Sequence, residues 1–432
     1  MYDLHTHRNI TFLDNLYIPC EALIRGDQTA IDLYGQQVYD NGFKERMLLE
    51  EKDLCAAFKN RFHFQASPLS EEEAEFPLAY GFVVYKNVVQ VLHMLAAFYQ
   101  PQNLYCINID SKSPDGLKKL LRGVESCFPN VHVVIGPSIE WGSYEIVTAV
   151  WNCLSYAEKS AHAWKYYQYL TGTDAPLKTN LEMVRIFKAL NGTMNMSYDI
   201  FNKTWLQGKQ EDGSPFLPIY KSFIPALIPR PAATAIVGSS QVADYLKWLK
   251  GCWIPEELIW ATIAGRPDLL PWPGAVPNSL MYQLKGTTEQ MLAQLIKGRN
   301  KTQRITITED FYGPATFDTP NQNWIARYQG WNSDDLLKCN KFTHTSCVFR
   351  VAELAALRNR PELTAHKINF EDQPVAFFCL LKEHLRRSLN PEPFDARNYT
   401  RLPEVELLRG VPLDELSMPK ASVNRLRRET RG

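Results

Sequence analysis

Short apolar runs alternate with helical patterns through the region from residue 76 to residue 180. The runs span residues 79–85, 104–109, 131–135 and 164–170, and an acid or a small polar cluster follows most of them. Apolar runs that alternate with helices are typical of a parallel sheet wound with helices. The sequence therefore predicts an α/β fold with a Rossmann-type sheet, and ligand groups at the carboxyl ends of its strands.

Other segments extend this pattern less regularly. Asn87 and Asn180 are placed to cap helices, and Ser113-Pro114 has the favoured order of a cap and a first-position proline. Helices are also predicted over 144–159, 240–249, 352–358 and 377–387, and another begins at Pro255. Strands are predicted over 232–237 and 346–349, and extended segments over 300–332.

Composition divides the chain into three parts. Residues 1–75 are polar with scattered charges and are interpreted as a stem or packing region, residues 76–390 as the catalytic domain, and residues 391–432 as a C-terminal tail with a solvated basic end. Lys+Arg and Asp+Glu are equal at 47 each, so the charge balance gives no electrostatic footprint for nucleic acid.

The cysteines have no Cys-x-x-Cys pair and no zinc-like spacing, which argues against a bound metal. They suit either scattered buried thiols or structural disulfides. Asn-x-Ser/Thr sequons favour the secretory pathway, whose oxidising compartments favour disulfides. The sequon asparagines are Asn9, Asn191, Asn195, Asn202, Asn300 and Asn398.

The amino-terminal residues lack the apolar region of a signal peptide, and no apolar run reaches the length of a membrane span. Two interpretations stay open on this basis. The chain is cytosolic, or it lacks its natural amino end.

Asp110 directly follows an apolar run. An acid at a strand end of a wound sheet commonly binds the ribose or base of a nucleotide. An Asp in this loop equally suits a cap for the helix at Pro114. The residues alone leave both roles open.

Two adjacent acids, Glu256 and Glu257, follow Pro255. Proline and acids in this order are typical of a helix start, where acids complement the helix dipole. Alternatively, one carboxylate held against Trp253 and Trp260 acts as a general base with a raised pKa, beside aromatic faces on which a sugar can stack.

Lys367 lies in a polar segment, where it is either solvated or neutralises a phosphate. The chain contains no Asp-x-Asp, the pair that nucleotide-sugar transferases commonly use to hold a divalent metal. If the protein breaks a sugar–phosphate bond, side-chain cations must therefore stabilise the leaving diphosphate.

Several segments, in order along the chain, resemble the core 2/I-branching β1,6-N-acetylglucosaminyltransferase family; these are residues 68–77, 173–180 and 383–387. The resemblance implies a GT-A-like nucleotide-sugar-binding fold, a UDP-sugar donor, a glycan or glycoprotein acceptor, inversion at the anomeric carbon and no metal. It also implies a type II membrane protein of the Golgi lumen, anchored through an amino-terminal segment that this chain lacks.

By position, the resemblance implies roles for single residues. Glu257 matches the catalytic base, Lys367 the lysine that meets the diphosphate, and Trp331 a tryptophan that stacks on the acceptor. Val84 and Asp110 match the uridine-binding edge. His344 stands where the family has an arginine for the diphosphate, so that contribution is weaker here or comes from Lys341.

The resemblance also implies the disulfides Cys20–Cys379, Cys55–Cys127, Cys106–Cys153 and Cys339–Cys347, and leaves Cys252 free. Arg230-Pro231 replaces a Gly-Ser of the family, and residues 191–219 differ from its acceptor segment. Three functions follow as alternatives: transfer of N-acetylglucosamine to a GalNAc-containing O-glycan core, transfer of glucose or xylose from UDP, or silent glycan binding on the same fold.

Overall fold

The computed structural model describes residues 12–13, 17–35, 37, 39, 41–199, 201–281, 283, 324–331, 339, 341–343 and 345–416. The chain divides into two compact units. Unit 1 comprises residues 1–140, 148–184 and 327–394, and unit 2 comprises residues 141–147, 185–326 and 395–432. The boundaries expected near residues 75 and 390 separate functional regions rather than compact structural units. They stay a prediction.

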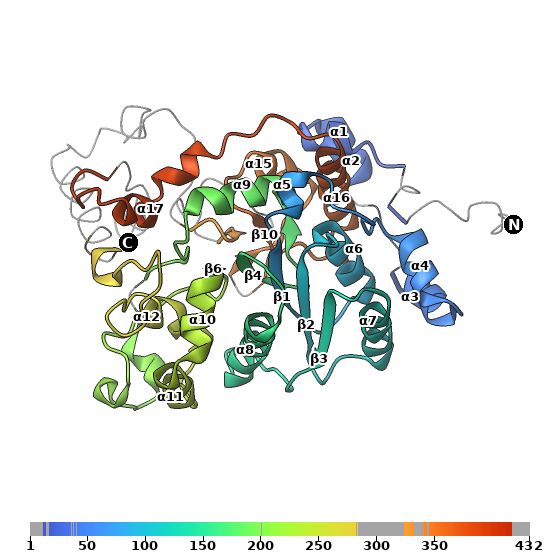
Figure 1. Ribbon diagram of the computed structural model, residues 1–432. Coiled ribbons are helices and arrows are strands. Elements are labelled where there is room, and N and C mark those ends of the chain that lie inside the picture. Colours follow the sequence, from blue (N-terminus) through green and yellow to red (C-terminus); the bar gives the residue numbers. More distant parts are fainter. Residues whose placement is uncertain are drawn as a thin grey trace, which may run out of the picture. The chain divides into compact units, whose positions relative to one another are not determined.

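Unit 1 is built on parallel strands in the order β3-β2-β1-β4 (Figure 1). These strands are β1 (Leu78–Val84), β2 (Leu104–Ile109), β3 (Val131–Ile135) and β4 (Tyr166–Thr171). The central strands β1 and β2 are buried almost throughout, as expected for a parallel sheet covered on both faces. The predicted α/β fold and its strands are confirmed.

Helices cover the two faces of this sheet. Gly81 of β1 lies under α8 (Tyr144–Lys159), where an added Cβ would meet Cys153 at 3.0 Å. The neighbouring Tyr80 and Phe82 instead contact Phe98 of α6 (Val88–Phe98), with ring centroids 5.4 and 6.3 Å away. Because side chains alternate along a strand, α8 and α6 lie on opposite faces.

The structure corrects the predicted helix caps. Asn87 precedes α6 in the left-handed region (φ 56°), and its side chain makes no capping hydrogen bond. α7 (Asp115–Cys127) is preceded by Pro114, not by Ser113. Thr179 caps α9 (Asn180–Leu190), since its Oγ1 accepts from the Glu182 amide at 3.3 Å.

The amino-terminal region consists of short helices in unit 1: α1 (Cys20–Ile24), α2 (Gln28–Tyr34), α3 (Asn41–Glu50), α4 (Leu54–Arg61) and α5 (Glu71–Ala74). Asp27, Asp53 and Ser70 each accept a hydrogen bond from the backbone amide three residues on. α4 packs on α7 and α1 on α16 (Pro374–Leu389). These helices therefore contact the rest of unit 1, and the role expected for residues 1–75 stays a prediction.

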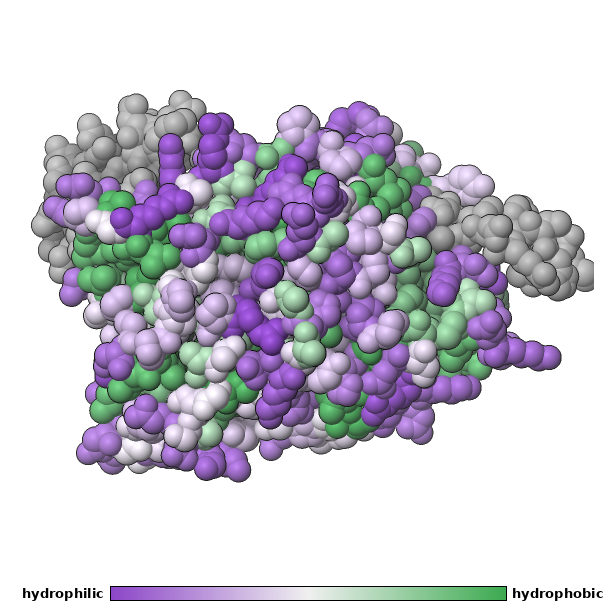
Figure 2. Space-filling view, in the orientation of Figure 1, coloured by the Kyte–Doolittle hydropathy of each residue, from purple (hydrophilic) through white to green (hydrophobic). Residues whose placement is uncertain are grey.

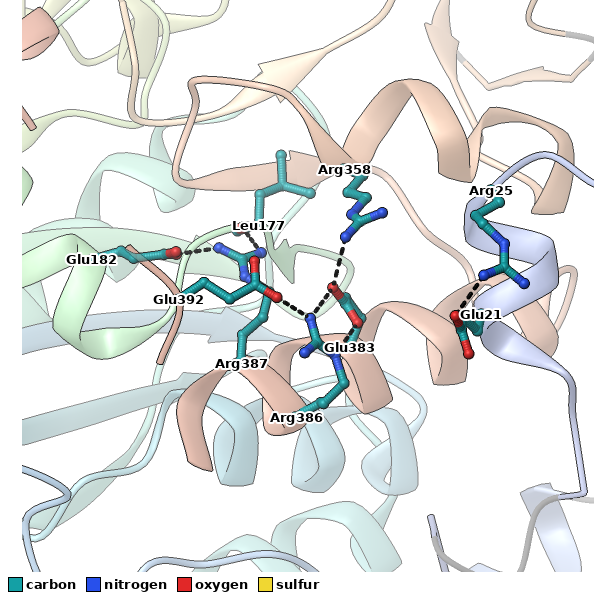
Figure 3. Close-up of polar contacts among 9 residues, drawn as sticks. All are labelled: Glu21, Arg25, Leu177, Glu182, Arg358, Glu383, Arg386, Arg387 and Glu392. Carbon is teal, nitrogen blue, oxygen red and sulfur yellow. Dashed lines mark hydrogen bonds and ion pairs between the residues drawn. The ribbon is translucent and has the colours of Figure 1, made fainter. Parts of the chain in front are cut away.

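Ion pairs link α16 to its neighbours. Arg387 donates to the Leu177 carbonyl at 3.1 Å and pairs with Glu182 of α9 (Figure 3). Arg386 pairs with Glu383 of α16 and with Glu392 just after it, and Glu383 also pairs with Arg358 of the preceding helix (Figure 3). The segment 383–387, one of those that carried the family resemblance, thus has a structural role in holding α16 to its neighbours.

Smaller strands complete unit 1. β5 (Ala175–Pro176), β10 (Thr364–His366) and β7 (Tyr328–Gln329) form a sheet in the order β5-β10-β7. β8 (Phe342–Thr343) pairs with β9 (Ser346–Cys347), which is shorter than the predicted strand over 346–349. The predicted helix over 352–358 begins as η4 (Val351–Glu353) and continues as α15 (Leu354–Arg358).

Unit 2 contains η1 (Lys203–Leu206), η2 (Glu211–Gly213), β6 (Leu227–Pro229), α10 (Arg230–Gly238), α11 (Ser240–Trp248), η3 (Pro255–Leu258), α12 (Trp260–Ile263), η5 (Arg397–Arg401) and α17 (Pro403–Leu408). The strand predicted over 232–237 is wrong, because those residues belong to α10. Pro231 lies in its first turn, and Ala232, Ala233 and Ile236 are buried at helical spacing. Most of the extended segments predicted over 300–332 lie outside the described residues.

Disulfides join Cys20 to Cys379, Cys55 to Cys127, Cys106 to Cys153 and Cys339 to Cys347. Cys252 is free and buried. None of the described helices is both long and apolar enough to cross a bilayer. On the face seen in Figure 2, hydrophobic residues lie in small groups between polar ones.

The predicted glycosylation sites differ in exposure. Asn191 and Asn202 are exposed and Asn398 is half-buried. Asn195 is fully buried, and its amide nitrogen donates to Glu404 Oε1 at 2.6 Å. A glycan on that nitrogen does not fit this fold, so the expectation for Asn195 is dropped. Asn9 and Asn300 lie outside the described residues.

Candidate active site

The predicted uridine edge lies at the carboxyl ends of β1 and β2 in unit 1. The Asp110 amide donates to the Val84 carbonyl at 2.9 Å, so these two residues are brought together. The buried Asp110 carboxylate accepts from the Lys112 amide at 2.8 Å and from the Ile139 amide at 3.2 Å. Asp110 therefore ties together the loops after β2 and β3 rather than capping α7. Its role toward uridine stays a prediction.

Beyond the end of β4 lies a cluster of charged residues that the sequence did not predict as a site. The buried Asp174 accepts from the Thr171 amide at 2.6 Å and lies 2.8 Å from His366 Nδ1. Arg327 Nη1 lies 3.7 Å from the same carboxylate. Burial raises the pKa of Asp174, but Arg327 and His366 outweigh this effect and lower the pKa. Asp174 is therefore an anion here.

Two effects keep His366 neutral in this cluster. Burial and, next, the Arg327 charge lower the pKa of His366 to about 4. The neighbouring Lys367 is anchored by its backbone, which donates to the Cys347 carbonyl at 3.3 Å and accepts from Phe349 at 3.0 Å. Burial and then Arg327 also lower the pKa of Lys367. Lys367 is thus a half-buried cation in a cluster, not a solvated loop lysine.

Trp331 follows Gly330 after β7 and forms an isolated bridge with Ser346 of β9. Its side chain is half-buried. The bridge fixes the backbone of Trp331 beside the Cys339–Cys347 disulfide. Its predicted stacking on an acceptor stays a prediction, and His344 lies outside the described residues.

Glu257 lies in unit 2, on η3. Its Oε2 is 3.5 Å from Lys221 Nζ, which also lies 3.7 Å from Asp199. The side chain of Glu257 is 21% exposed, so it is not fully enclosed by unit 2. A carboxylate held by a neighbouring cation can accept a proton from a bound hydroxyl group.

The adjacent Glu256 has the opposite environment. Burial, followed by the charge of Glu257, raises the pKa of Glu256 to about 8. Its Oε2 has no hydrogen-bond partner among the described residues. Trp260 is also buried and donates to the Ile224 carbonyl at 2.7 Å, so it offers no face to a ligand. The sequence alone could not tell which of the two adjacent acids points inward.

Exposed tryptophans lie near Glu257 in unit 2. Trp141 is 64% exposed and Trp253 is 43% exposed, with ring centroids 5.8 Å apart. Trp205 lies 5.7 Å from Trp253, and Lys221 Nζ lies 5.5 Å from the Trp205 ring. Lys221 thus connects this tryptophan cluster (Trp141, Trp205, Trp253) to Glu257. Flat aromatic faces exposed to solvent suit the apolar face of a sugar ring.

The residues described give no set of three or more His, Cys, Asp or Glu side chains that could hold a metal ion. The polar groups gathered at the two sites are carboxylates and side-chain cations. The cations are Lys367 and Arg327 in unit 1, and Lys221 in unit 2. This donor set suits anions and hydroxyl groups.

Comparison with known proteins gives consistent matches. The model of the family "Core-2/I-Branching enzyme" matches residues 78–283. A human β-1,3-galactosyl-O-glycosyl-glycoprotein β-1,6-N-acetylglucosaminyltransferase is 31% identical over 393 residues, which cover 85% of each chain. The enzyme of that name numbered 3 in Bos taurus is 31% identical over 67% of this chain and 70% of its own. A relative from bovine herpesvirus 4 is 31% identical over 65% and 68%.

Proposed function

Because the chain belongs to the core-2/I-branching enzyme family of glycosyltransferases, we propose that it transfers N-acetylglucosamine from UDP-N-acetylglucosamine to a GalNAc-containing O-glycan core. The linkage formed is β1,6, and no metal ion takes part. Relatives that carry this activity in their names, across most of the chain length, support the proposal.

The structural observation that carries the proposal is the position of Glu257. Its side chain is partly exposed, and its carboxylate lies 3.5 Å from Lys221 Nζ. In the proposed step Glu257 takes the proton of the acceptor hydroxyl as that oxygen bonds to C1 of the sugar. The bond from C1 to the diphosphate oxygen breaks, and UDP leaves with the electron pair. Attack from the opposite side inverts the anomeric carbon.

The donor is assigned to the carboxyl edge of the sheet in unit 1. Val84 and Asp110 hold the uridine, and Lys367 binds the diphosphate, a role for which His344 is a second candidate by sequence position alone. Ligands of wound parallel sheets bind at this edge, which supports the assignment. Trp331 stacks on the acceptor. A side-chain cation takes the role that a metal has in other nucleotide-sugar transferases.

The proposed location is the Golgi lumen. The disulfides fit an oxidising compartment. The exposed sequon at Asn202 fits the same pathway, because the Thr204 hydroxyl donates to Asn202 Oδ1 at 2.9 Å in an open surface turn.

The experiment that tests this function measures UDP release by the oxidised protein and by Glu257→Gln in excess EDTA, with a galactosyl-GalNAc acceptor. General-base catalysis contributes about 10²–10⁴-fold, so the variant should lose activity by this factor. Near-native activity of the variant would remove Glu257 from the mechanism. Loss of wild-type activity in EDTA would contradict the proposal that no metal ion takes part.

One observation favours a second donor class. Residues 230–238 form the helix α10, which begins with Arg230-Pro231. The family resemblance placed a Gly-Ser at this point, so the side chains differ here. UDP-glucose and UDP-xylose are therefore included in the assay, and selective use of either would replace N-acetylglucosamine as the transferred sugar.

A further inference from the structure

Arg327 in unit 1 is a buried arginine whose guanidinium is incompletely paired. Its residue surface is only 5% exposed, and its Nε and Nη1 have no hydrogen-bond partner in the described part of the chain. Nη2 reaches Gln329 Oε1 at 3.3 Å, and Nη1 lies 3.7 Å from Asp174, beyond hydrogen-bond distance. Buried donors without partners are costly, so they are rare in folded proteins.

A second buried arginine in the same unit shows the usual solution. Arg360 is 8% exposed, and it donates from Nε and Nη2 to both oxygens of Glu362 at 3.0 and 2.8 Å. This fork-to-fork pairing satisfies the guanidinium with a carboxylate. Among the described residues Arg327 has no such partner, although it is equally buried. Its Nε and Nη1 donors are therefore left without the anion that a buried guanidinium usually pairs with.

The charges around Arg327 do not balance within the part of the chain that is described. Arg327 and Lys367 supply two positive charges, and Asp174 supplies one negative charge, which leaves one positive charge in excess. His366 does not change this sum near neutral pH. No described residue forms a hydrogen bond or ion pair with the Lys367 ammonium. A partly buried excess of positive charge favours the binding of an anion.

The cluster lies at the same edge of the sheet as Val84. Val83 of β1 is in register with Thr171, the last residue of β4, and Asp174 follows three residues later. Asp174 leads into β5, which is joined through β10 to β7, the strand that Arg327 precedes. The carboxyl ends of β1 and β4 and the approach to β7 are therefore connected through these strand pairings.

We propose that Arg327 binds the diphosphate of the nucleotide-sugar donor together with Lys367, and supplies the paired donors that this anion needs. The proposal rests on the proposed function for the identity of the nucleotide. A guanidinium presents its donors in a planar fork that matches two oxygens of a phosphate group. Binding would fill the vacant donors of Arg327 and offset the excess charge in one step.

The test compares wild type, Arg327→Gln and Arg327→Lys by calorimetric titration in excess EDTA, with uridine, UDP and inorganic pyrophosphate as separate probes. Arg327→Gln should weaken UDP and pyrophosphate binding about 10- to 100-fold, the range of lost charge-assisted hydrogen bonds. Uridine affinity should stay unchanged. Arg327→Lys should recover part of the loss, because it restores the charge without the fork.

Arg358→Gln is the control, since Arg358 is 43% exposed and pairs with Glu383 at 3.8 Å. It should leave all three affinities unchanged. Equal UDP affinity in wild type and Arg327→Gln would overturn the proposal, as would an equal loss of uridine and UDP, which marks a structural role. If Arg327→Gln does not fold, unchanged UDP affinity in Arg327→Lys overturns it.

Failure of the proposed function gives a different pattern. If wild type binds pyrophosphate through Arg327 but binds neither UDP nor uridine, the anion site stands and the nucleotide donor is wrong. If wild type binds UDP and uridine while Arg327→Gln binds both as tightly, the donor stands and Arg327 has no part in it. Binding of none of the three probes contradicts both.

Discussion

Lys221 Nζ lies 3.5 Å from Glu257 Oε2, and it bridges this carboxylate to Asp199 at 3.7 Å. The same ammonium lies 5.5 Å from the centroid of Trp205 and 4.8 Å from that of Phe223. Lys221 is therefore held between two acids and two aromatic rings. It fixes the orientation of Glu257 relative to the tryptophan cluster, and a catalytic base requires a fixed orientation.

Lys221→Gln is expected to lower kcat about tenfold, which corresponds to about 1.4 kcal/mol of lost transition-state stabilisation. The reason is that Glu257 loses the cation that orients it. Steady-state kinetics with varied acceptor measures the effect. Lys247→Gln is the control, because Lys247 forms an exposed ion pair with Asp244 in the same unit. An unchanged kcat for Lys221→Gln would show that Glu257 needs no such partner.

Trp253→Ala should raise the acceptor KM about fivefold, because one aromatic contact contributes about 1 kcal/mol. UDP affinity should not change. Trp248 is the matched control, since it is a half-buried tryptophan of unit 2 that stacks on Tyr245 outside the cluster. If Trp253→Ala and Trp248→Ala gave the same acceptor KM, the cluster would not be a sugar-binding surface.

Arg387→Ala is expected to lower the free energy of unfolding by about 2–4 kcal/mol, since it leaves the partly buried Glu182 carboxylate without its partner. The two side chains are only 13% and 10% exposed. In contrast, Arg25 and Glu21 are 61% and 83% exposed (Figure 3), so Arg25→Ala should cost less than about 1 kcal/mol. Denaturant unfolding of both variants measures the difference, and equal losses would contradict this account of α16.

Glu404→Gln should stabilise the protein increasingly as the pH rises. Burial raises the pKa of Glu404 to about 7, above its ordinary value of 4.5. The folded state therefore holds a proton that the unfolded state releases, and the wild type loses stability from about pH 4.5 up to about pH 7. The neutral amide of the variant does not ionise, so its stability carries no such penalty.

Thermal unfolding of the wild type and Glu404→Gln at pH 5 and pH 8 tests this sign. The difference between their free energies of unfolding should grow by up to about 3 kcal/mol between the two pH values. Asn195 can still donate to the amide oxygen of the variant, as it does to Glu404 at 2.6 Å. A difference that stays constant with pH would show that Glu404 is ionised throughout.

The sheet could be predicted from the sequence because its strands are continuous apolar runs of strand length, and helices with a strong apolar period separate them. The helix α10 was predicted as a strand because its apolar run is equally short. A short run of Ala, Ile and Val fits a strand or a buried helix equally well, and only its packing in unit 2 decides between them. The predicted cap at Asn180 was wrong because the neighbouring Thr179 makes the capping hydrogen bond instead.

Sequence context marked Asp110, the adjacent Glu256 and Glu257, and Lys367 as candidates with two roles each. The family resemblance then favoured one role for Glu257 and for Lys367, but neither line of reasoning pointed to their neighbours Lys221 and Arg327. Arg327 contacts Asp174 across more than a hundred residues of sequence, and no local pattern marks such a contact. The capping signal at Ser70, by contrast, was present in the sequence as Ser-x-x-Glu and could have shown helix α5.

The most direct test of the central claim is acceptor-dependent UDP release in excess EDTA, measured for the wild type and Glu257→Gln side by side with UDP-N-acetylglucosamine. We predict turnover by the wild type, unaffected by the chelator, and a loss of about 10²–10⁴-fold in the variant. A variant that retains near-native turnover, or a wild type that needs a metal ion, would contradict the account.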